Sequence, residues 1–321
     1  MDKLYVSSSL QLKSARTTQK IMLDVIIALI PAVAASVVIF GLRSLLLVAV
    51  CVLTSVATEF VCRKIMKRSN TIGDLSAVVT GLLLAYNLPP SLPLWMAVIG
   101  AVAAIVVAKH LFGGIGQNFV NPALIGRIVL MNSFATAMTT WTEPFAYKAV
   151  PGSFADAITS ATPLMSQLRG EELPSLMQMF IGQRQGCLGE TCALALLIGF
   201  VYLVIRRVIN PFVPVIFVGT VAVCSIINGD NALYQIMSGG LLLGAVFMAT
   251  DYATTPVTFW GKIIFAFGCG LITSLIRIYG SLPEGVSYSI IIMNILTPYV
   301  ERLTVSKPFG YIKTKKGGAS E

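Results

Sequence analysis

The sequence predicts an all-α polytopic membrane protein that crosses the bilayer about ten times, in two inverted repeats of about five helices each. Three observations support this prediction. Only 12% of the residues are charged, whereas soluble domains carry about a quarter, so much of the surface must face hydrocarbon. Long apolar runs recur along the chain. Two of these runs are interrupted at matching positions in the two halves.

The apolar runs are long enough, or nearly long enough, to cross the hydrocarbon core of a bilayer. A polar N-terminal arm precedes the first run, and it stays polar for too long to be a typical secretory signal. We expect the spans near residues 21–41, 43–62, 74–88, 93–111, 119–139, 189–206, 211–228, 235–252, 259–280 and 286–304.

The spans divide the chain into four regions. They are residues 1–139, a cytoplasmic arm with the first five-helix repeat; 140–188, an extracytoplasmic loop; 189–304, the second inverted five-helix repeat; and 305–321, a basic cytoplasmic tail. Most Lys and Arg residues fall on the side of the N-terminus, and basic loops stay in the cytoplasm, so both termini are expected there. The net charge of +9 therefore suits an anionic lipid surface rather than nucleic acid.

The third span of each group is broken. Span 74–88 ends at the run Asn87-Leu-Pro-Pro90, and span 235–252 contains glycines and ends at Asp251, with Pro256 behind it. Backbone freed from a helix cannot face lipid, so it must be covered by protein or line a polar cavity. Paired broken helices indicate a binding site near the middle of the membrane. The candidates to line it are Asn87, Gln117, Asn118, Asn121 and Asp251.

Charged residues inside spans cost about 3 kcal/mol each near the bilayer centre, so they need a task or a partner. The candidates are Asp24, Glu59, Asp74, Arg127, Glu190 and Asp251. Asp74 and Glu190 begin spans, where a carboxylate complements the positive end of a helix, and a place at the membrane interface explains both, as it does Glu59. Arg127 requires a carboxylate or a phosphate nearby. Asp251 closes a broken helix, which favours a functional role.

The cysteines and the single histidine give no basis for a metal site. The six cysteines lie mostly in apolar segments without ligand spacing, and His110 stands alone. Cys187 and Cys192 could form a disulfide, although a helix is expected to begin at Cys192. We therefore expect no metal ion and no catalytic side chain, so that any redox chemistry must come from a bound cofactor.

The predicted extracytoplasmic loop contains the stretch DAITSATPL, residues 156–164. Its side chains are small and polar, and Pro163 favours an extended backbone at Thr162, which would leave that hydroxyl open to a modifying enzyme. A local turn closed by a Ser or Thr hydroxyl explains the same residues equally well. The residues of this stretch leave both interpretations open.

Four segments together resemble one family: AKHLFGGIGQNFVNPALIGR (108–127), GCLGETCALALLIG (186–199), FMATDYATTP (247–256) and DAITSATPL. It is the family of the D subunits of Rnf complexes, which are similar to the B subunits of the sodium-translocating NADH:quinone reductases. In this family a loop threonine carries covalent FMN as a phosphoester, in a motif that reads Asp-x-x-Ser/Thr-Gly-Ala-Thr/Ser. The resemblance implies that Thr162 carries the FMN. Asp156, Thr159 and Ala161 match the motif, and Ser160 replaces its glycine.

The resemblance also implies a second flavin, a noncovalent riboflavin held near the broken helices. By their position in the motifs, Asn121 and Asp251 are its candidate contacts, and Gly81 allows close approach to its ring.

The implied function is that of a flavoprotein component of an ion-translocating ferredoxin:NAD+ oxidoreductase in the prokaryotic cytoplasmic (inner) membrane. The implied partners are the A, B, C, E and G subunits of the Rnf complex, membrane lipid, a flavin transferase, and Na+ or H+ as the transported ion, with no nucleic acid. The alternative is a small-solute channel or transporter without flavin, because inverted repeats with broken helices also build urea-transporter-like conduits.

Overall fold

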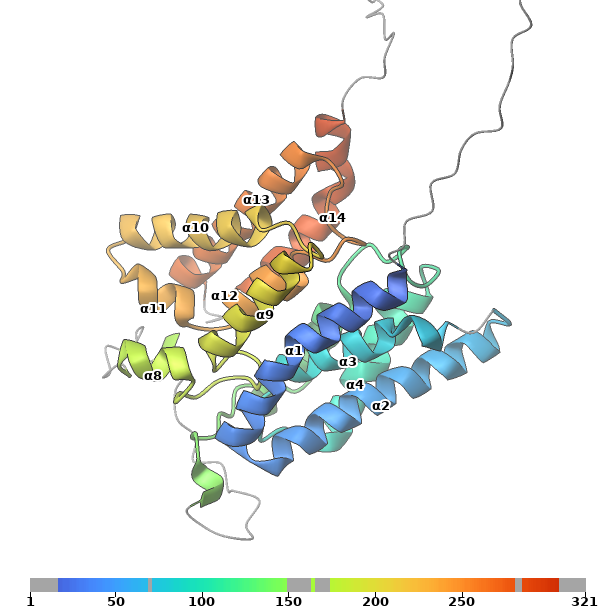
Figure 1. Cartoon of the computed structure of the whole chain (residues 1–321), viewed down its shortest axis with the longest axis horizontal. Helices are drawn as coiled ribbons and strands as arrows, with labels where there is room; N and C mark the ends of the chain where they lie inside the picture. The colour runs from blue at the N-terminus through green and yellow to red at the C-terminus, as the bar shows by residue number, and fades with distance from the viewer. Residues whose placement is uncertain (1–16, 69–70, 149–162, 165–173, 281–284, 306–321) are drawn as a thin grey trace, which may run out of the picture.

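The computed structural model describes residues 17–68, 71–148, 163–164, 174–280 and 285–305. Over these residues the chain forms helices, turns and loops and contains no strand, so the all-α prediction is confirmed. Figure 1 shows two groups of helices side by side, one built from the N-terminal half of the chain and the other from the C-terminal half.

In the N-terminal group, two long helices pack against a short third one. The helices are α1 (Thr18–Phe40), α2 (Leu42–Ile65), α3 (Ser76–Tyr86), α4 (Leu94–Ala103), α5 (Pro122–Ser133) and α6 (Ala135–Met138), with short 3-10 turns η1 (Ile72–Asp74) and η3 (Ala146–Lys148). At its end α4 continues into a π-helix, η2 (Ala104–His110). Such π-helical turns are rare and frequently occur at functional sites.

The C-terminal group also combines long helices with interrupted ones. Its helices are α8 (Leu176–Ile181), α9 (Ala193–Ile205), α10 (Phe212–Ile227), α11 (Ala232–Met237), α12 (Leu241–Leu243), α13 (Phe259–Tyr279) and α14 (Val286–Thr304). The short helix α12 continues into a second π-helix, η4 (Gly244–Met248). The two groups meet where α1 packs against α9.

The described ends of the chain lie on one side of the molecule. In Figure 1 the chain enters α1 at the upper end of that helix and leaves α14 at the top of the picture, whereas the turn η3 lies at the bottom. The turn η3 is therefore on the side opposite to the start of α1 and the end of α14.

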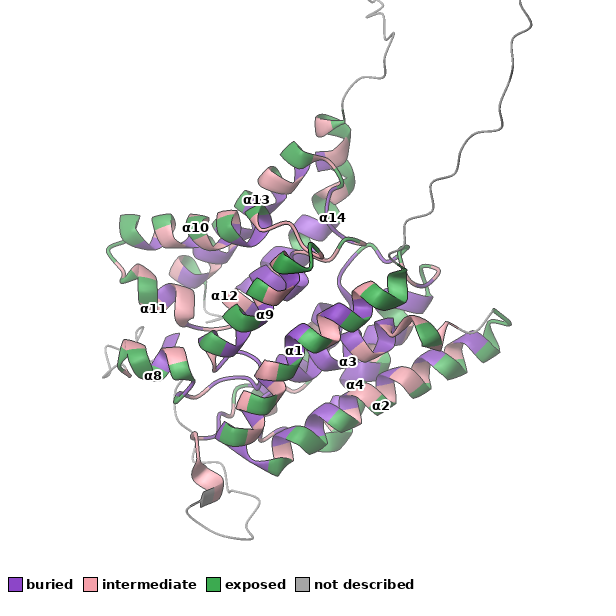
Figure 2. Cartoon of the chain, in the orientation of Figure 1, coloured by how far each residue is buried: buried purple, intermediate pink, exposed green. Residues whose placement is uncertain are grey.

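Three helices, α1, α2 and α13, are long and apolar enough to cross a membrane. The helices expose large apolar residues outwards, as Figure 2 shows along α2 and α10 at opposite edges of the molecule. Leu53 on α2 is 69% exposed and Ile227 on α10 is 80% exposed. An apolar surface of this extent suits lipid or a partner protein rather than water. The chain is thus an integral membrane protein.

The helix breaks occur near the predicted positions, but the limits differ in detail. α3 ends at Tyr86, because the prolines that follow cannot continue a helix. The predicted span 119–139 is divided at Phe134 into α5 and α6. The predicted span 235–252 is also divided, since α11 ends before Ser238 and α12 begins only after Gly240.

The largest difference concerns the start of α9, which lies at Ala193 rather than at the predicted residue 189. The residues before it form a loop that lies against the end of α3. In that loop the N–H of Leu188 donates to the carbonyl of Leu88 at 3.1 Å, and the N–H of Gly189 donates to that of Tyr86 at 2.9 Å. The prediction that Glu190 begins a helix is therefore wrong.

Candidate functional site

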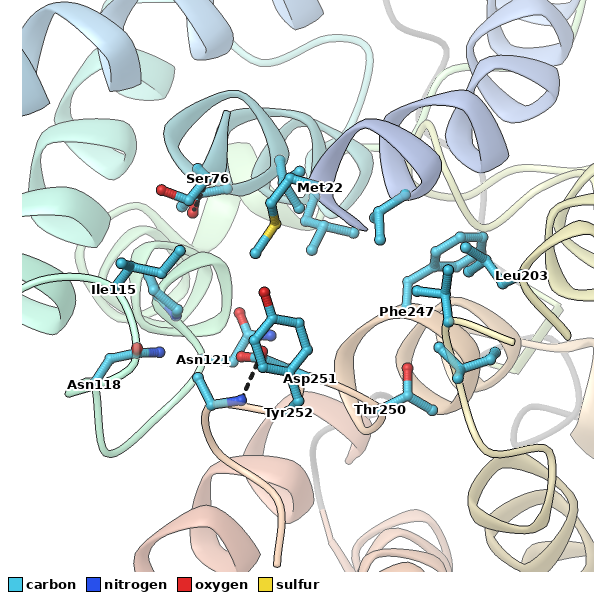
Figure 3. A pocket seen from close by; sticks show the side chains of 18 of the residues that line it. Met22, Ser76, Ile115, Asn118, Asn121, Leu203, Phe247, Thr250, Asp251 and Tyr252 are labelled. Atoms are coloured by element: carbon cyan, nitrogen blue, oxygen red, sulfur yellow. Dashed lines mark hydrogen bonds between the residues drawn. The ribbon is translucent and has the colours of Figure 1, made fainter. Parts of the chain in front are cut away.

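A cavity opens where the interrupted segments of the two groups meet (Figure 3). It encloses about 820 Å³, including its mouth. We call it the main cavity. Its walls are mostly apolar, with Met22, Leu203 and Phe247 around it, and its polar lining consists of Ser76, Thr80, Lys109, Asn118, Asn121, Thr250, Asp251 and Tyr252. A largely apolar cleft with a few polar groups is the usual form of a small-molecule site.

Asp251 is held by the turn that follows η4. Its carboxylate accepts hydrogen bonds from the N–H of Ala253 at 3.2 Å and from the hydroxyl of Thr254 at 3.4 Å. Its backbone carbonyl accepts from the hydroxyl of Thr255 at 2.8 Å. A carboxylate offers about four acceptor positions, so these bonds fix the side chain and leave acceptor capacity for a ligand in the cavity.

Asn121 lies on the same cavity and caps α5. Its side-chain oxygen accepts from the N–H of Ala123 at 3.0 Å, and Pro122 occupies the first helical position, where no N–H is needed. Asn294 of α14 lies between Thr254, which follows Asp251, and Asn121. With its side-chain amide in the orientation that satisfies both of its ends, the nitrogen donates to the carbonyl of Thr254 at 3.3 Å and the oxygen accepts from the N–H of Asn121 at 3.2 Å. The two predicted residues Asn121 and Asp251 are therefore parts of one cavity.

Lys109 lines the main cavity, and the buried carboxylate of Glu59 balances its positive charge. Its ammonium lies 2.8 Å from the carboxylate of Glu59 and donates to the hydroxyl of Ser76 at 2.5 Å. The side chains of Lys109 and Glu59 are 3% and 0% exposed. The sequence predicts Lys109 at the cytoplasmic end of a span, whereas its place on the π-helix η2 turns it inwards. The signal in the sequence is a lysine that directly follows a long apolar run.

A second polar region lies at the other end of α3. Arg127 of α5 forms an ion pair with Glu190 at 3.3 Å and donates to the side-chain oxygen of Asn87, which follows α3. Both charged side chains are buried. The expectation that Arg127 has an acidic partner is thus confirmed, and the partner is Glu190, which the sequence predicts at the start of a helix.

Two further buried arginines surround the same loop. Arg184 donates from Nε to the carbonyl of Thr191 at 3.2 Å and from Nη2 to that of Glu190. Arg277 of α13 interacts electrostatically with both Glu190 and Arg184. We call Arg127, Arg184 and Arg277 the arginine cluster. Arg184 and Arg277 lie at predicted outer loops or helix ends, and nothing in their spacing indicates that they converge.

Gly81 does not line the main cavity. A Cβ at this position would lie 2.7 Å from the Cα of Val52 and 2.9 Å from the carbonyl oxygen of Cys51. The glycine therefore allows α3 to approach the backbone of α2. The close approach of Gly81 to a flavin ring stays a prediction, and the contact that the structure shows at this glycine is with α2.

The predicted FMN motif lies outside the described residues. This applies to Asp156, Thr159, Ser160, Ala161 and Thr162. The two residues that follow, Pro163 and Leu164, are described and both are buried. All six cysteines are free thiols, so Cys187 and Cys192 form no disulfide. Among the described residues no group of His, Cys, Asp and Glu could hold a metal ion.

The chain is thus a helical membrane protein whose interrupted helices meet at a largely apolar cavity, a candidate site for a small ligand, with buried ion pairs beside it. The family model for the NQR2, RnfD, RnfE family matches residues 5–310. The chain therefore belongs to this family.

Several relatives resemble the chain along nearly its whole length. It is 48% identical to the D subunit of the Na+-translocating ferredoxin:NAD+ oxidoreductase complex of Acetobacterium woodii, over 98% of this chain and 97% of the relative. It is 41% identical to the D subunit of the proton-translocating ferredoxin:NAD+ oxidoreductase complex of Clostridium ljungdahlii, over 95% of this chain and 96% of the relative. It is 34% identical to the D subunit of the ion-translocating oxidoreductase complex of Stutzerimonas stutzeri, over 94% of each.

Proposed function

We propose that this chain is the D subunit of a membrane complex that transfers electrons from reduced ferredoxin to NAD+ and moves Na+ or H+ across the membrane. The observation that carries this proposal is the match to D subunits of such complexes over almost the full length of both chains. Two of these relatives are named for different ions, so the transported cation belongs to the proposal only as Na+ or H+. The other subunits of the complex are the partners of this chain.

We further propose that Thr162 carries FMN through a phosphoester bond, attached by a flavin transferase. The flavin would supply the redox chemistry. The motif formed by Asp156, Thr159 and Ala161 supports this assignment, and Ser160 is small enough for the position that glycine usually holds. The burial of Pro163 and Leu164 gives further support, because it ties the chain next to Thr162 to the folded part of the protein.

The main cavity is our candidate for the noncovalent riboflavin. Its mostly apolar walls suit a planar aromatic ring system. Asn121 and Asp251 would provide polar contacts, and Asp251 retains acceptor capacity for a ring N–H. Lys109 would place a positive charge beside the ligand, held in position by Glu59 and Ser76.

For the whole chain we propose ten spans in two inverted five-helix repeats, with residues 1–139 and 189–304 as the repeats and 140–188 as an extracytoplasmic loop. Three features support this layout: the short broken helix α3, the interrupted segment of α11, α12 and η4, and the position of the described ends on one side. The bias of Lys and Arg supports a cytoplasmic location for that side and for residues 305–321, the proposed basic tail.

The proposal can be tested on the purified chain, produced together with its flavin transferase. After denaturation and gel electrophoresis, the band should show flavin fluorescence, and mass spectrometry should find the added mass on the peptide that contains Thr162. The Thr162→Ala variant should lose the fluorescence completely. The Ser153→Ala variant is the matched control, since it removes a hydroxyl of the same loop outside the motif, and it should remain fluorescent.

An unmodified peptide in the wild-type protein would contradict the flavoprotein assignment and would favour the alternative, a conduit for a small solute. A fluorescent Thr162→Ala band would instead place the flavin on another residue.

A further inference from the structure

A buried positive charge at the end of α2 has no acidic partner among the described residues. Arg63 stands in the last turn of α2 and is 8% exposed. Its Nε is buried without a hydrogen-bond acceptor, and its guanidinium belongs to none of the ion pairs in the described part of the chain. A buried cation without an opposite charge is costly. A ligand that brings a negative charge to Arg63 would therefore be stabilised there.

The acidic side chain one turn before Arg63 is already occupied. Glu59 forms an ion pair with Lys109 at 2.8 Å and accepts from the hydroxyl of Thr71 at 3.1 Å. The side chains of Glu59 and Lys109 are both buried. Because this carboxylate lies near two buried cations and pairs with one of them, the region around Arg63 retains a positive charge.

His110 adds a second polar group without a described partner. It follows Lys109 in the π-helix η2 and is 1% exposed, and neither of its ring nitrogens has a hydrogen-bond partner among the described residues. It interacts electrostatically with Glu59, Arg63 and Arg68. A neutral imidazole has one N–H to donate. Arg63 and His110 thus bring two buried donors without a described acceptor to the same region.

The loop that follows η2 lies against the end of α2. We call residues 111–118 the glycine loop, since they include three glycines with positive φ angles. A Cβ at Gly114 would lie 2.6 Å from Nη2 of Arg63, so glycine leaves room for that guanidinium. Arg68, beyond the end of α2, donates from Nη1 to the carbonyl of Gly113 at 2.9 Å. The glycine loop is therefore adjacent to both guanidiniums.

The surroundings of Arg63 mark a boundary between hydrocarbon and water. α2 is long and apolar enough to cross a membrane, and its end reaches the right-hand edge of the molecule in Figure 1. Ile65 is 74% exposed and follows the exposed Lys64. Phe112 in the glycine loop and Phe119 after it are both exposed and pack edge to face at 4.5 Å. Exposed aromatic and basic side chains gather at the level of lipid headgroups, where the phosphates lie.

We propose that Arg63 binds the headgroup phosphate of an anionic phospholipid at the end of α2, with His110 and Arg68 beside it. A guanidinium matches the geometry of a phosphate and binds it with two parallel hydrogen bonds. The acyl chains would lie along the apolar outer surface of α2. A zwitterionic lipid is a poorer ligand, because its ammonium group would add a positive charge to a region that already has an excess. The inference goes beyond the proposed function and requires neither the flavins nor the transported ion.

The test is a lipid titration of the purified full-length chain in a neutral detergent. Dioleoylphosphatidylglycerol should raise the apparent melting temperature of the wild-type chain by about 3 °C, since a bound ligand stabilises the folded state. Dioleoylphosphatidylcholine has the same acyl chains and no net charge, and it should raise the melting temperature by less than about 1 °C. In Arg63→Gln, the phosphatidylglycerol concentration that gives half of the effect should rise about tenfold, because charge-assisted hydrogen bonds are lost.

The matched control is Lys64→Gln, which removes the same charge from the adjacent residue. Lys64 is exposed, whereas Arg63 is buried against the glycine loop. Its variant should change the half-maximal concentration by less than about twofold, since exposed charges contribute little. Arg63→Lys keeps the charge and loses the forked donor, so it should give an intermediate shift of about threefold.

The delipidated chain provides a readout that separates lipid binding from a purely structural role of Arg63. Because the guanidinium is buried without a described opposite charge, Arg63→Gln should not lower the melting temperature of the delipidated chain. Native mass spectrometry should find phosphatidylglycerol retained by the wild-type chain and by Lys64→Gln, and lost from Arg63→Gln. If Arg63→Gln does not fold, Arg63→Lys decides the question by its shift in the lipid titration.

Four results would overturn the inference. Equal stabilisation of the wild-type chain by the two lipids would mean that only the acyl chains are bound. Stabilisation by inorganic phosphate as strong as that by phosphatidylglycerol, and lost in Arg63→Gln, would mean that the site binds a free anion. A lower melting temperature of delipidated Arg63→Gln with an unchanged lipid titration would make Arg63 a structural residue. An unchanged titration with weaker assembly of the complex would assign Arg63 to an acidic surface of another subunit. The flavin assay is independent of all four, so the proposed function is judged separately.

Discussion

The main cavity and the arginine cluster are built from the same helix, α3, but they differ in charge. Thr80 and Leu83 of α3 line the main cavity, where the one lysine is paired with Glu59 and the apolar walls predominate. Asn87, at the end of α3, contacts the arginine cluster, where positive charge exceeds negative charge. The first region has the form of a small-molecule site, and in the second the guanidiniums bond to Glu190, Asn87 and backbone carbonyls of the protein itself.

This difference bears on what each region could hold. A ligand that is not covalently attached must be bound by the cavity itself, so its site has to be largely apolar and already formed. The main cavity meets this description, whereas the arginine cluster consists of buried ion pairs and hydrogen bonds around a loop. The two regions lie towards opposite ends of a single short helix.

The largest expected effect of a single substitution concerns the charge balance of the arginine cluster. Glu190→Gln removes the carboxylate that pairs with Arg127 and leaves three buried guanidiniums without it. Loss of one partner of a buried ion pair costs about 3–5 kcal/mol, so the variant should unfold at a markedly lower denaturant concentration. The measurement is the free energy of unfolding in a denaturing-detergent titration.

The matched control is Asp24→Asn, which breaks the ion pair with Arg206 at 3.2 Å. Because the side chain of Arg206 is 56% exposed, this change should have little effect on the unfolding free energy. Equal losses of unfolding free energy in Glu190→Gln and Asp24→Asn would mean that the buried ion pair of Arg127 and Glu190 stabilises the protein no more than the exposed pair of Asp24 and Arg206.

A smaller effect is expected where α3 packs against α2, because both regions depend on the position of α3. Gly81→Ala would place a Cβ 2.7 Å from the Cα of Val52, which α2 can accommodate only by moving away. Overpacking of this kind costs about 2 kcal/mol in unfolding free energy. Gly219→Ala in α10 is the control, since no atom lies within 4 Å of the added Cβ, and it should stabilise the protein by about 0.5–1 kcal/mol. If the unfolding free energies of Gly81→Ala and Gly219→Ala changed in the same direction, the close packing of α3 against α2 at Gly81 would be contradicted.

The sequence predicted the all-α class, the break after Tyr86 and the position of Asn121 and Asp251 at one cavity, because each follows from local chemistry. Prolines end α3, an Asn–Pro pair begins α5, and a glycine-containing segment ends in an aspartate. These signals depend on a few neighbouring residues. Local signals of this kind can be recognised without any knowledge of the tertiary structure.

The sequence could not predict contacts between residues that are far apart along the chain. Glu190 was expected to begin a helix, but the loop before α9 is held by the backbone of α3 and turns that side chain towards Arg127. Lys109 lies near the end of the predicted span 93–111, and no residue near it along the chain indicates its burial, which its pairing with Glu59 allows. Gly81 was assigned to a ring contact because nothing local indicates the approach of α2.

The smallest expected effect, and the one that separates the two regions most directly, is a change of ligand content. Asp251→Asn keeps the size of the side chain and removes the charge that faces the main cavity. Because hydrogen bonds to a charged group are stronger than neutral ones, we expect about tenfold weaker retention of noncovalent flavin. The flavin released by acid should fall accordingly, and the covalent flavin that remains with the protein should not change. Asp230→Asn is the control, since Asp230 lines a separate cavity together with Ser225 and Ser274, and it should leave the released flavin unaltered. If both variants lose flavin to the same extent, the main cavity is not the site of the noncovalent flavin.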